Sequence, residues 1–337
     1  MRYPISIQTF AIIRNGNYVY VDKTDLVYRL AQEHVCFLSR PRRFGKSLLI
    51  STLDAYFSGR SELFRGLKME ALEDKWDVYP VFRIDFAKGR FDVTGELEKI
   101  LEEYVSSWEV IYGKSDIYTT LSSRFQYVLE QAAAQTGHKA VILIDEYDKP
   151  LLDVLEEDLE DVNRSILKDF YGTFKAADAS LRFVLLTGVT KFSQITVFSG
   201  FNQPNDISMD SRYDAICGIT EDELYSVFGE AISEMAKKFD YTVDEMKALL
   251  KKQYDGYHFS EAMLDMYNPF SIINAFDKLK LDNYWYKSGT PTYLVKLLEG
   301  HHVNMQKLTG RAYESQYFVD YRADAENPLA MLYQSGY

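Results

Sequence analysis

The chain of 337 residues has a net charge of −12, with 47% hydrophobic and 26% charged residues, which is ordinary for a folded globular protein of about two domains. The acidic balance argues against a protein that coats nucleic acid or an anionic membrane through bulk charge. Two cysteines, Cys36 and Cys217, are too few for a disulfide framework. Because we find no leader pattern and no apolar run of membrane-spanning length, we expect a cytoplasmic protein without a membrane partner.

The first part of the chain alternates apolar strands with helical segments. We expect strands at 34–39, 80–86, 139–145 and 181–188, with 213–218 as a candidate fifth strand, and helices at 48–57, 94–112, 117–136 and near 150–178. The nearly continuous Val/Ile/Leu run at 139–145 is typical of a parallel strand covered on both faces. The alternation predicts an α/β fold, a doubly wound parallel sheet with helices on both sides.

From Thr220 onward the pattern is mostly helical. The string Thr220-Glu221-Asp222-Glu223 has the spacing of a capping box at a helix start. Breaks at 254–259 and at Asn268-Pro269 divide this part into shorter helices. We therefore expect two domains, a core at 1–219 and a helical region at 220–337.

A phosphate-binding loop is predicted between the first strand and the helix that follows it. In such a loop the backbone N–H groups and the helix N-terminus attract phosphates, Lys46 reaches the β and γ oxygens, and Ser47 ligates Mg²⁺. The pattern G-x-x-x-x-G-K-[ST] is broken at Arg40, which stands where glycine is expected. We assign nucleotide binding to the residues of this loop, namely Arg42, Arg43, Phe44, Gly45, Lys46, Ser47 and Leu48.

Two acids follow the buried strand 139–145. In the additional-strand class of P-loop NTPases the first acid holds magnesium and the second polarises the attacking water. This pattern predicts Asp145 as a metal ligand together with Ser47, and Glu146 as a catalytic residue together with Lys46. The alternative is a strand that happens to end in solvated acids.

Other polar residues have two interpretations each. Thr187, at the end of the strand 181–188, would sense the γ-phosphate as a catalytic residue, or it would cap a turn together with Thr190. Asp85 would lie in the outer shell of the metal or serve a structural role. The segment 20–24 would contact the nucleotide or cap a helix through its polar side chains.

A cluster of positive charge lies in the predicted loop. Arg40, Arg42, Arg43 and Lys46 fall within seven residues and would offset phosphate charge, or one arginine would act in trans on a neighbour's nucleotide. We find no competing nucleophile motif and no histidine pair at metal-ligand spacing beyond the adjacent His301-His302, which we take as a solvated loop.

The set of motifs resembles the predicted AAA-ATPase-like family of bacterial proteins, which is related to archaeal ATPase and STAND-type P-loop proteins. The strings that carry the resemblance are YVDKT at 20–24, FLSRPRRFGKSL at 37–48 and LIDEYDKP at 143–150, with further similarity at 186–192, 198–202, 255–259, 267–269 and 288–291. Because the family loop also begins with R-P-R-R, the resemblance makes Arg40 a family trait.

The resemblance implies an ATPase core at about 20–220, a helical and winged-helix-like region behind it, and ATP rather than GTP as the nucleotide. Members often continue into a C-terminal PD-(D/E)XK nuclease-like domain. The string 332–337 resembles the link into that domain, so we expect this chain to stop short of it, with DNA as a partner only through the missing domain.

The leading functional hypothesis is a Mg²⁺-dependent ATPase that couples hydrolysis to movement of the helical region or of an attached effector domain. Two alternatives stay open, a STAND-like nucleotide switch or scaffold with little turnover and a nucleic-acid-processing module. A homo-oligomer is a further expectation. The sequence does not identify an arginine finger, for which Arg164, Arg182 and Arg212 are all unsupported candidates. The macromolecular target is not specified by these residues.

Overall fold

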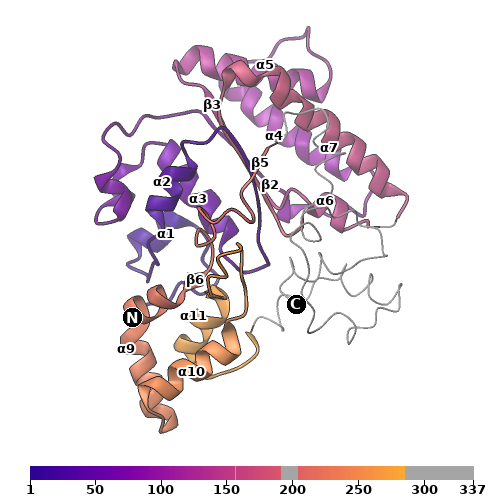
Figure 1. Ribbon diagram of the computed structural model, residues 1–337. Helices are drawn as coiled ribbons and strands as arrows, with labels where there is room; N and C mark the ends of the chain where they lie inside the picture. Colours follow the sequence, from indigo (N-terminus) through magenta and orange to yellow (C-terminus); the bar gives the residue numbers. More distant parts are fainter. Residues whose placement is uncertain (156, 191–203, 285–337) are drawn as a thin grey trace.

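A five-stranded parallel sheet forms the centre of the protein in the computed structural model, which describes residues 1–155, 157–190 and 204–284 (Figure 1). The strands are β1 (Val35–Ser39), β2 (Val81–Asp85), β3 (Ala140–Asp145), β4 (Leu181–Gly188) and β5 (Asn205–Asp206), in the order β2-β3-β4-β1-β5. The strand β4 lies between β1 and β3 although it follows both in sequence. This insertion is the additional-strand arrangement that the sequence predicts.

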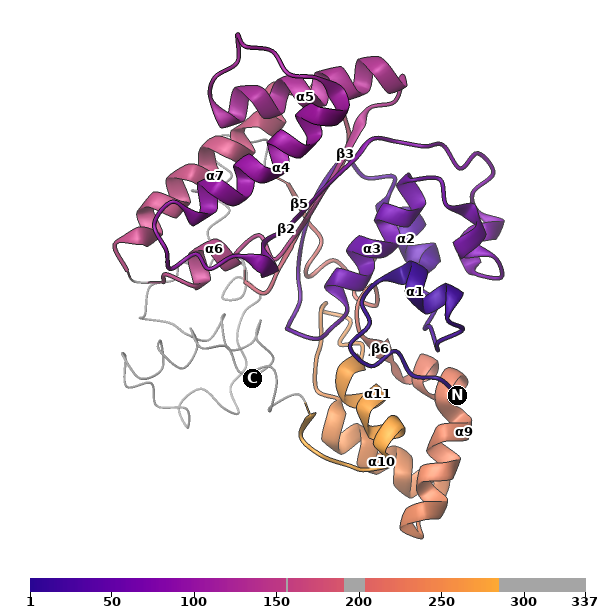
Figure 2. The same cartoon turned by 180° about the vertical axis from the view of Figure 1, so that it is seen from behind.

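Helices cover both faces of the sheet, as Figures 1 and 2 show. One face carries α1 (Phe10–Asn15), α2 (Thr24–Leu30) and α3 (Lys46–Phe57), and the other carries α4 (Glu96–Tyr112), α5 (Leu121–Thr136), α6 (Lys149–Leu152) and α7 (Leu159–Ala176). Short 3₁₀ turns lie at Ser61–Phe64, Lys68–Ala71, Phe86–Lys88 and Asp178–Ser180.

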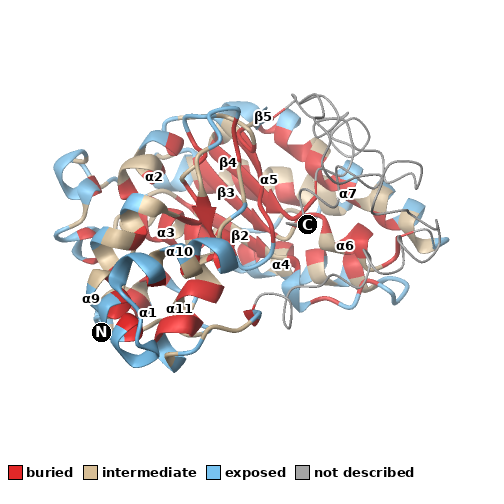
Figure 3. Ribbon diagram, turned by 60° about the horizontal axis from the view of Figure 1, so that its bottom comes forward, coloured by how far each residue is buried: buried red, intermediate tan, exposed pale blue. Residues whose placement is uncertain are grey.

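The strand β3 explains why the sheet needs two helical layers. All six of its residues are buried, and its side chains alternate between two hydrophobic clusters. Ile142 and Ile144 pack with α4, α5 and α7, whereas Val141 and Leu143 pack with α1 to α3. Because successive side chains of a strand point to opposite faces, a continuous apolar run requires cover on both sides. Figure 3 shows the resulting buried centre.

A helical unit packs beside the N-terminal segment. It consists of α9 (Glu221–Phe239), α10 (Val243–Tyr254) and α11 (Pro269–Lys278), with β6 (Ile219–Thr220) paired antiparallel to β7 (Met266–Tyr267). Its own hydrophobic cluster also receives Tyr3, Val19 and Val21. The capping box at Thr220 and Glu223 is confirmed, since each side chain bonds the other's backbone N–H.

The candidate fifth strand at 213–218 is not a strand in the structure. The segment 213–218 is a series of turns, in which Ile216 N–H donates to Tyr213 O and Gly218 N–H donates to Phe44 O. Its apolar residues are buried by packing against the loop after β1. Their burial explains an apolar pattern that resembles that of a strand in the sequence. The fifth strand is the polar β5. The helical region expected near 150–178 consists of the two helices α6 and α7.

Some expectations lie outside the described residues. These are the family similarities at 191–192, 198–202 and 288–291, the pair His301-His302, and the link at 332–337. The expected winged-helix-like region includes residues 285–337, which lie outside the described residues, so it stays a prediction. Among the residues that the structure describes, no helix combines the length and the apolar character needed to cross a membrane.

Candidate functional site

The loop between β1 and α3 turns sharply around two residues with left-handed backbone, Arg43 at φ +69° and Gly45 at φ +97°. Gly45 is the N-cap of α3, so the helix begins at Lys46. A side chain at position 45 would meet no atom within 4 Å, so glycine is favoured there by the backbone angle rather than by space. The first N–H groups of α3 lie at this turn and have no partner within the helix.

The loop borders a cavity of about 480 Å³. Every residue from Arg42 to Leu48 contributes to its wall. Further contributors include residues of the N-terminal segments 4–8 and 19–23, the segment 216–219, Glu146 and Lys149, and Pro269, Phe270, Ile273 and Asn274 of α11. The cavity therefore lies between the sheet domain and the helical unit.

Lys46 is 7% exposed and bonds to its own loop. Its Nζ donates to the carbonyl oxygens of Arg40 at 2.8 Å and Pro41 at 3.1 Å. Burial lowers the pKa of Lys46, while the nearby carboxylates of Asp145, Glu146 and Asp148 act to raise it. The lysine is thus desolvated beside the cavity and held only by neutral acceptors in these two bonds.

The two acids after β3 have different surroundings. Asp145 is 2% exposed, and its Oδ1 accepts a hydrogen bond from Thr187 Oγ1 at 2.8 Å. Glu146 has a left-handed φ of +54° and faces the cavity. Burial raises the pKa of Glu146, as do the charges of Asp148 and Asp145, while Lys46 and Arg42 lower it.

Most of the predicted site residues come together. The seven loop residues and Glu146 line one cavity, whereas Asp145 and Thr187 are buried outside its lining and bonded to each other. Thr187 therefore contacts the predicted metal ligand. The N–H and the hydroxyl of Thr190 both donate to Asp148 Oδ2.

Arg40 does not line the cavity, although the sequence predicts that it offsets phosphate charge. It is 1% exposed, and its guanidinium donates to the carbonyl oxygens of Ser39, Ser208 and Tyr213. Its Cζ lies 4.1 Å from the centre of the Phe259 ring. Only Arg42 and Arg43 of the arginine cluster line the cavity. Arg40 thus joins the loop to chain segments that precede and follow β6, which explains why a large residue stands where the common pattern has glycine.

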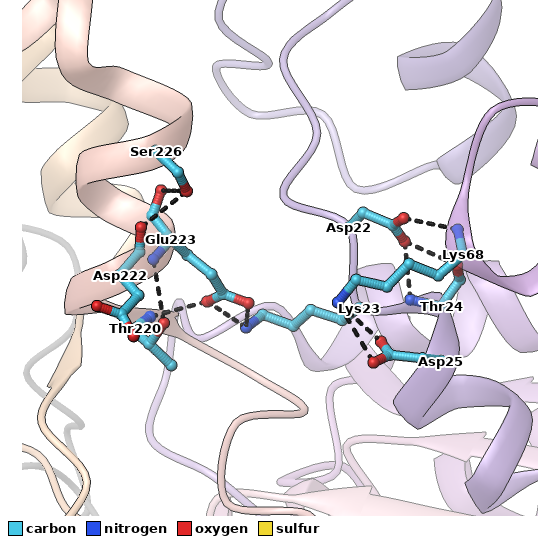
Figure 4. Close-up of polar contacts among 9 residues, drawn as sticks. All are labelled: Asp22, Lys23, Thr24, Asp25, Lys68, Thr220, Asp222, Glu223 and Ser226. Carbon is cyan, nitrogen blue, oxygen red and sulfur yellow. Dashed lines mark hydrogen bonds and ion pairs between the residues drawn. The ribbon is translucent and has the colours of Figure 1, made fainter.

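The sequence reasoning missed the part that Lys23 plays in this region. Its Nζ donates to both carboxylate oxygens of Glu223, at 2.8 and 2.7 Å, and the two side chains are only 10% and 23% exposed. This ion pair joins the N-terminal segment to the first turn of α9 across 200 positions, and Lys23 lines the cavity (Figure 4). In the sequence, the indication of this role was the lysine within the string YVDKT at 20–24.

The neighbours of Lys23 have the capping role that the sequence left open. Asp22 Oδ1 accepts from the N–H and the hydroxyl of Thr24, and its Oδ2 accepts from Lys68 N–H. Segment 20–24 therefore both caps local structure and contributes to the cavity wall. Asp85 has the structural role, since its Oδ1 accepts from Ala87 N–H at the start of a 3₁₀ turn.

Within the described residues, no group of three or more His, Cys, Asp and Glu side chains gathers as a ready-made metal site. Magnesium commonly binds through one or two protein oxygens together with phosphates and water, so this finding is compatible with the predicted ligands. Ser47 in the first turn of α3 and Asp145 at the end of β3 offer the oxygen donors that Mg²⁺ prefers.

A parallel sheet with an inserted strand, and a glycine turn that opens a helix with Lys46 and Ser47, define a P-loop NTPase type of fold. The profile of the family described as "Predicted AAA-ATPase" matches residues 4–198, and the chain belongs to that family.

A relative is an uncharacterized protein encoded in the vnfD 5′ region of Azotobacter chroococcum mcd 1. The two sequences are 41% identical over 305 residues, which cover 88% of this chain and 56% of the relative. The chain thus spans little more than half the length of that protein.

Proposed function

We propose that this protein binds ATP in the cavity and hydrolyses it in the presence of Mg²⁺. The observation that carries the proposal is that the loop Arg42–Leu48 and Glu146, predicted separately as phosphate-binding and catalytic groups, line the same cavity. The N–H groups at the start of α3 and the positive end of its dipole favour a polyphosphate there. Membership of a predicted ATPase family supports the same conclusion.

Lys46 is the proposed phosphate-binding side chain. Its two acceptors in the loop are backbone carbonyls, which phosphate oxygens would replace with a stronger, charge-assisted interaction. The desolvation that lowers the pKa of Lys46 also strengthens its attraction to an incoming anion. Magnesium, bound by Ser47 and Asp145 together with the phosphates, would neutralise charge on the phosphoryl group.

Glu146 is the proposed group that orients the attacking water and accepts its proton. Its position on the cavity wall gives it access to water beside a bound nucleotide, while Asp145, bonded to Thr187, is the proposed metal ligand. Thr187 acts through Asp145 in this scheme and would respond to the γ-phosphate indirectly. The cavity also has apolar wall residues at Ile5, Ile7, Val21, Phe270 and Ile273, which suit a base. The preference for ATP over GTP rests on the family.

The helical unit is the proposed moving part, in keeping with a division into a core at 1–219 and a second domain from 220. Because α11 and the N-terminal segment share the cavity wall with the loop, a nucleotide would contact both units at once. A homo-oligomer, a DNA partner and a cytoplasmic location stay predictions.

The test compares the parental chain with Glu146→Gln. We expect the parent to release phosphate from Mg-ATP, and the variant to bind ATP while its turnover falls about 10²- to 10⁴-fold, the range attributed to general acid–base catalysis. Glu230→Gln, an exposed residue of α9, is the matched control. A Glu146→Gln variant that hydrolyses ATP at the parental rate would show that the catalytic assignment is wrong.

A nucleotide-dependent switch is the second candidate. It is favoured by the ion pair of Lys23 and Glu223, which joins the two units at the cavity wall. Binding of ATP to the parent without release of phosphate, together with altered hydrogen exchange in α9 to α11, would support this candidate over the ATPase.

A further inference from the structure

Asp148 is a buried carboxylate that the proposed hydrolytic site does not use directly. It is 1% exposed and lies three residues beyond Asp145. Its Oδ2 accepts from Val189 N–H at 2.8 Å, from Thr190 N–H at 2.7 Å and from Thr190 Oγ1 at 2.8 Å. Burial raises the pKa of Asp148, and the donors of Thr190 and Val189 oppose that rise because they favour the ionised form. These three bonds, which we name the Asp148 clamp, tie the turn after β3 to the chain that leaves β4.

The two segments are also in close contact through Tyr147 and Gly188. Tyr147 N–H donates to Thr187 O and its hydroxyl donates to Thr190 O, both at 3.0 Å. A Cβ added to Gly188 would lie 2.6 Å from the Tyr147 ring and 2.8 Å from Asp148 Oδ1. Such distances leave no space for a side chain, so the turn rests directly on the backbone of β4.

Glu146 lies in the middle of this fixed turn. On one side Asp145 is bonded to Thr187, and on the other Tyr147 N–H is bonded to the backbone of the same threonine. The left-handed φ of Glu146, +54°, is uncommon for a residue with a side chain and persists only where the surroundings impose it. The bonds on both sides supply that constraint, and Glu146 faces the cavity as a result.

We propose that Asp148 is a positioning residue, which holds the turn after β3 against the exit of β4 and thereby fixes Glu146 for attack on a bound nucleotide. This inference rests on the proposed function, because it assigns a role in the hydrolytic step. Asp148 itself lies outside the cavity lining and needs no contact with the ligand. Nucleotide binding depends on the loop around Lys46, so loosening the clamp should slow hydrolysis without weakening affinity.

The experiment measures kcat, KM and the dissociation constant of Mg-ATP for the full chain and three clamp variants. Asp148→Asn keeps the shape of the side chain but removes the charge that all three donors face. Thr190→Val removes the hydroxyl donor alone, and Thr190→Ser retains it. Asp244→Asn removes the same charge from an exposed position on α10 and serves as the control.

We expect Asp148→Asn to lower kcat about 10- to 100-fold, the scale of a catalytic group displaced by about 1 Å, with the dissociation constant of Mg-ATP near the parental value. Thr190→Val should lower kcat to a smaller extent, and Thr190→Ser should restore it. If Asp148 had a purely structural role, Asp148→Asn would lower the melting temperature both with and without Mg-ATP and would leave the kcat of the folded protein unchanged.

The outcomes separate this inference from the function on which it rests. A parental chain without turnover would refute the proposed hydrolysis and the positioning role together. An active parent whose Asp148→Asn variant keeps full kcat overturns the positioning role alone. If Asp148→Asn does not fold, the pair Thr190→Val and Thr190→Ser decides, since equal kcat values in both would also overturn it.

Discussion

Two buried lysines border the same cavity, and their partners differ in kind. Lys46 donates to two carbonyls of its own loop, whereas Lys23 donates to a carboxylate from another part of the chain. Burial lowers the pKa of both lysines, and nearby carboxylates oppose that effect, chiefly Asp145 at Lys46 and Glu223 at Lys23. A lysine held by neutral groups is available for an incoming anion, while a lysine already paired with a carboxylate holds two parts of the molecule together.

Because of this difference, we expect the loop around Lys46 and the region around Lys23 to have separate roles, although both border the same cavity. The loop around Lys46 would bind the ligand, and the region around Lys23 would maintain the spacing between the N-terminal segment and α9. Variants of the two lysines should therefore change different measurable properties.

The largest expected effect is on nucleotide binding in Lys46→Met. The parent should gain about 2.7 kcal/mol of stability at an ATP concentration 100 times its dissociation constant, and the variant should lose that gain. The stability without nucleotide should change little, because the variant also removes the cost of burying a charge. A thermal-shift titration with Mg-ATP measures both quantities. If Lys46→Met keeps the ATP-dependent shift in melting temperature, Lys46 is not needed for nucleotide binding and the proposed difference in role between the two lysines is wrong.

The next effect is on stability in Lys23→Met. The change leaves the carboxylate of Glu223 largely buried without its cation, which should lower the free energy of unfolding by about 2 kcal/mol. Urea denaturation measures this loss.

The double variant Lys23→Met with Glu223→Gln provides the control. Because the second change removes the uncompensated charge, the double variant should be more stable than the sum of the two single losses predicts. Strict additivity would indicate that the pair contributes nothing as a pair, and the two lysines would then differ less than their geometry suggests.

The smallest effect is expected for Thr220→Ala. Loss of this N-cap should cost about 1 kcal/mol, since Thr220 Oγ1 accepts from Glu223 N–H. Thr242→Ala removes the equivalent cap of α10 and is the matched comparison. The Thr220 variant should lose more stability, because its capping box also holds Glu223 for Lys23. If urea denaturation shows equal losses of stability in the two variants, the Thr220 cap does not contribute to the ion pair of Lys23 and Glu223.

Local patterns predicted the features that depend on neighbours in the chain. The apolar run at 139–145 indicated β3 because burial on both faces favours hydrophobic residues at successive positions of a strand. The spacing of Thr220 and Glu223 indicated a capping box because its bonds span three residues. The loop from Arg42 to Leu48 was recognisable for the same reason, since a glycine turn that opens a helix is a local structure.

The sequence by itself thus determined the class of the sheet, the glycine turn that opens α3 and the start of α9. Only the tertiary structure decided the rest, because pairings between distant segments leave no periodic pattern. The strand β5 is two polar residues defined by pairing with Cys36 and Phe37 of β1. Lys23 pairs with Glu223, which lies 200 positions further along the chain, and Asp148 accepts hydrogen bonds from Thr190, which lies 42 positions further along. In each case the partner is set by how the strands and helices pack, which the order of residues within one segment does not encode.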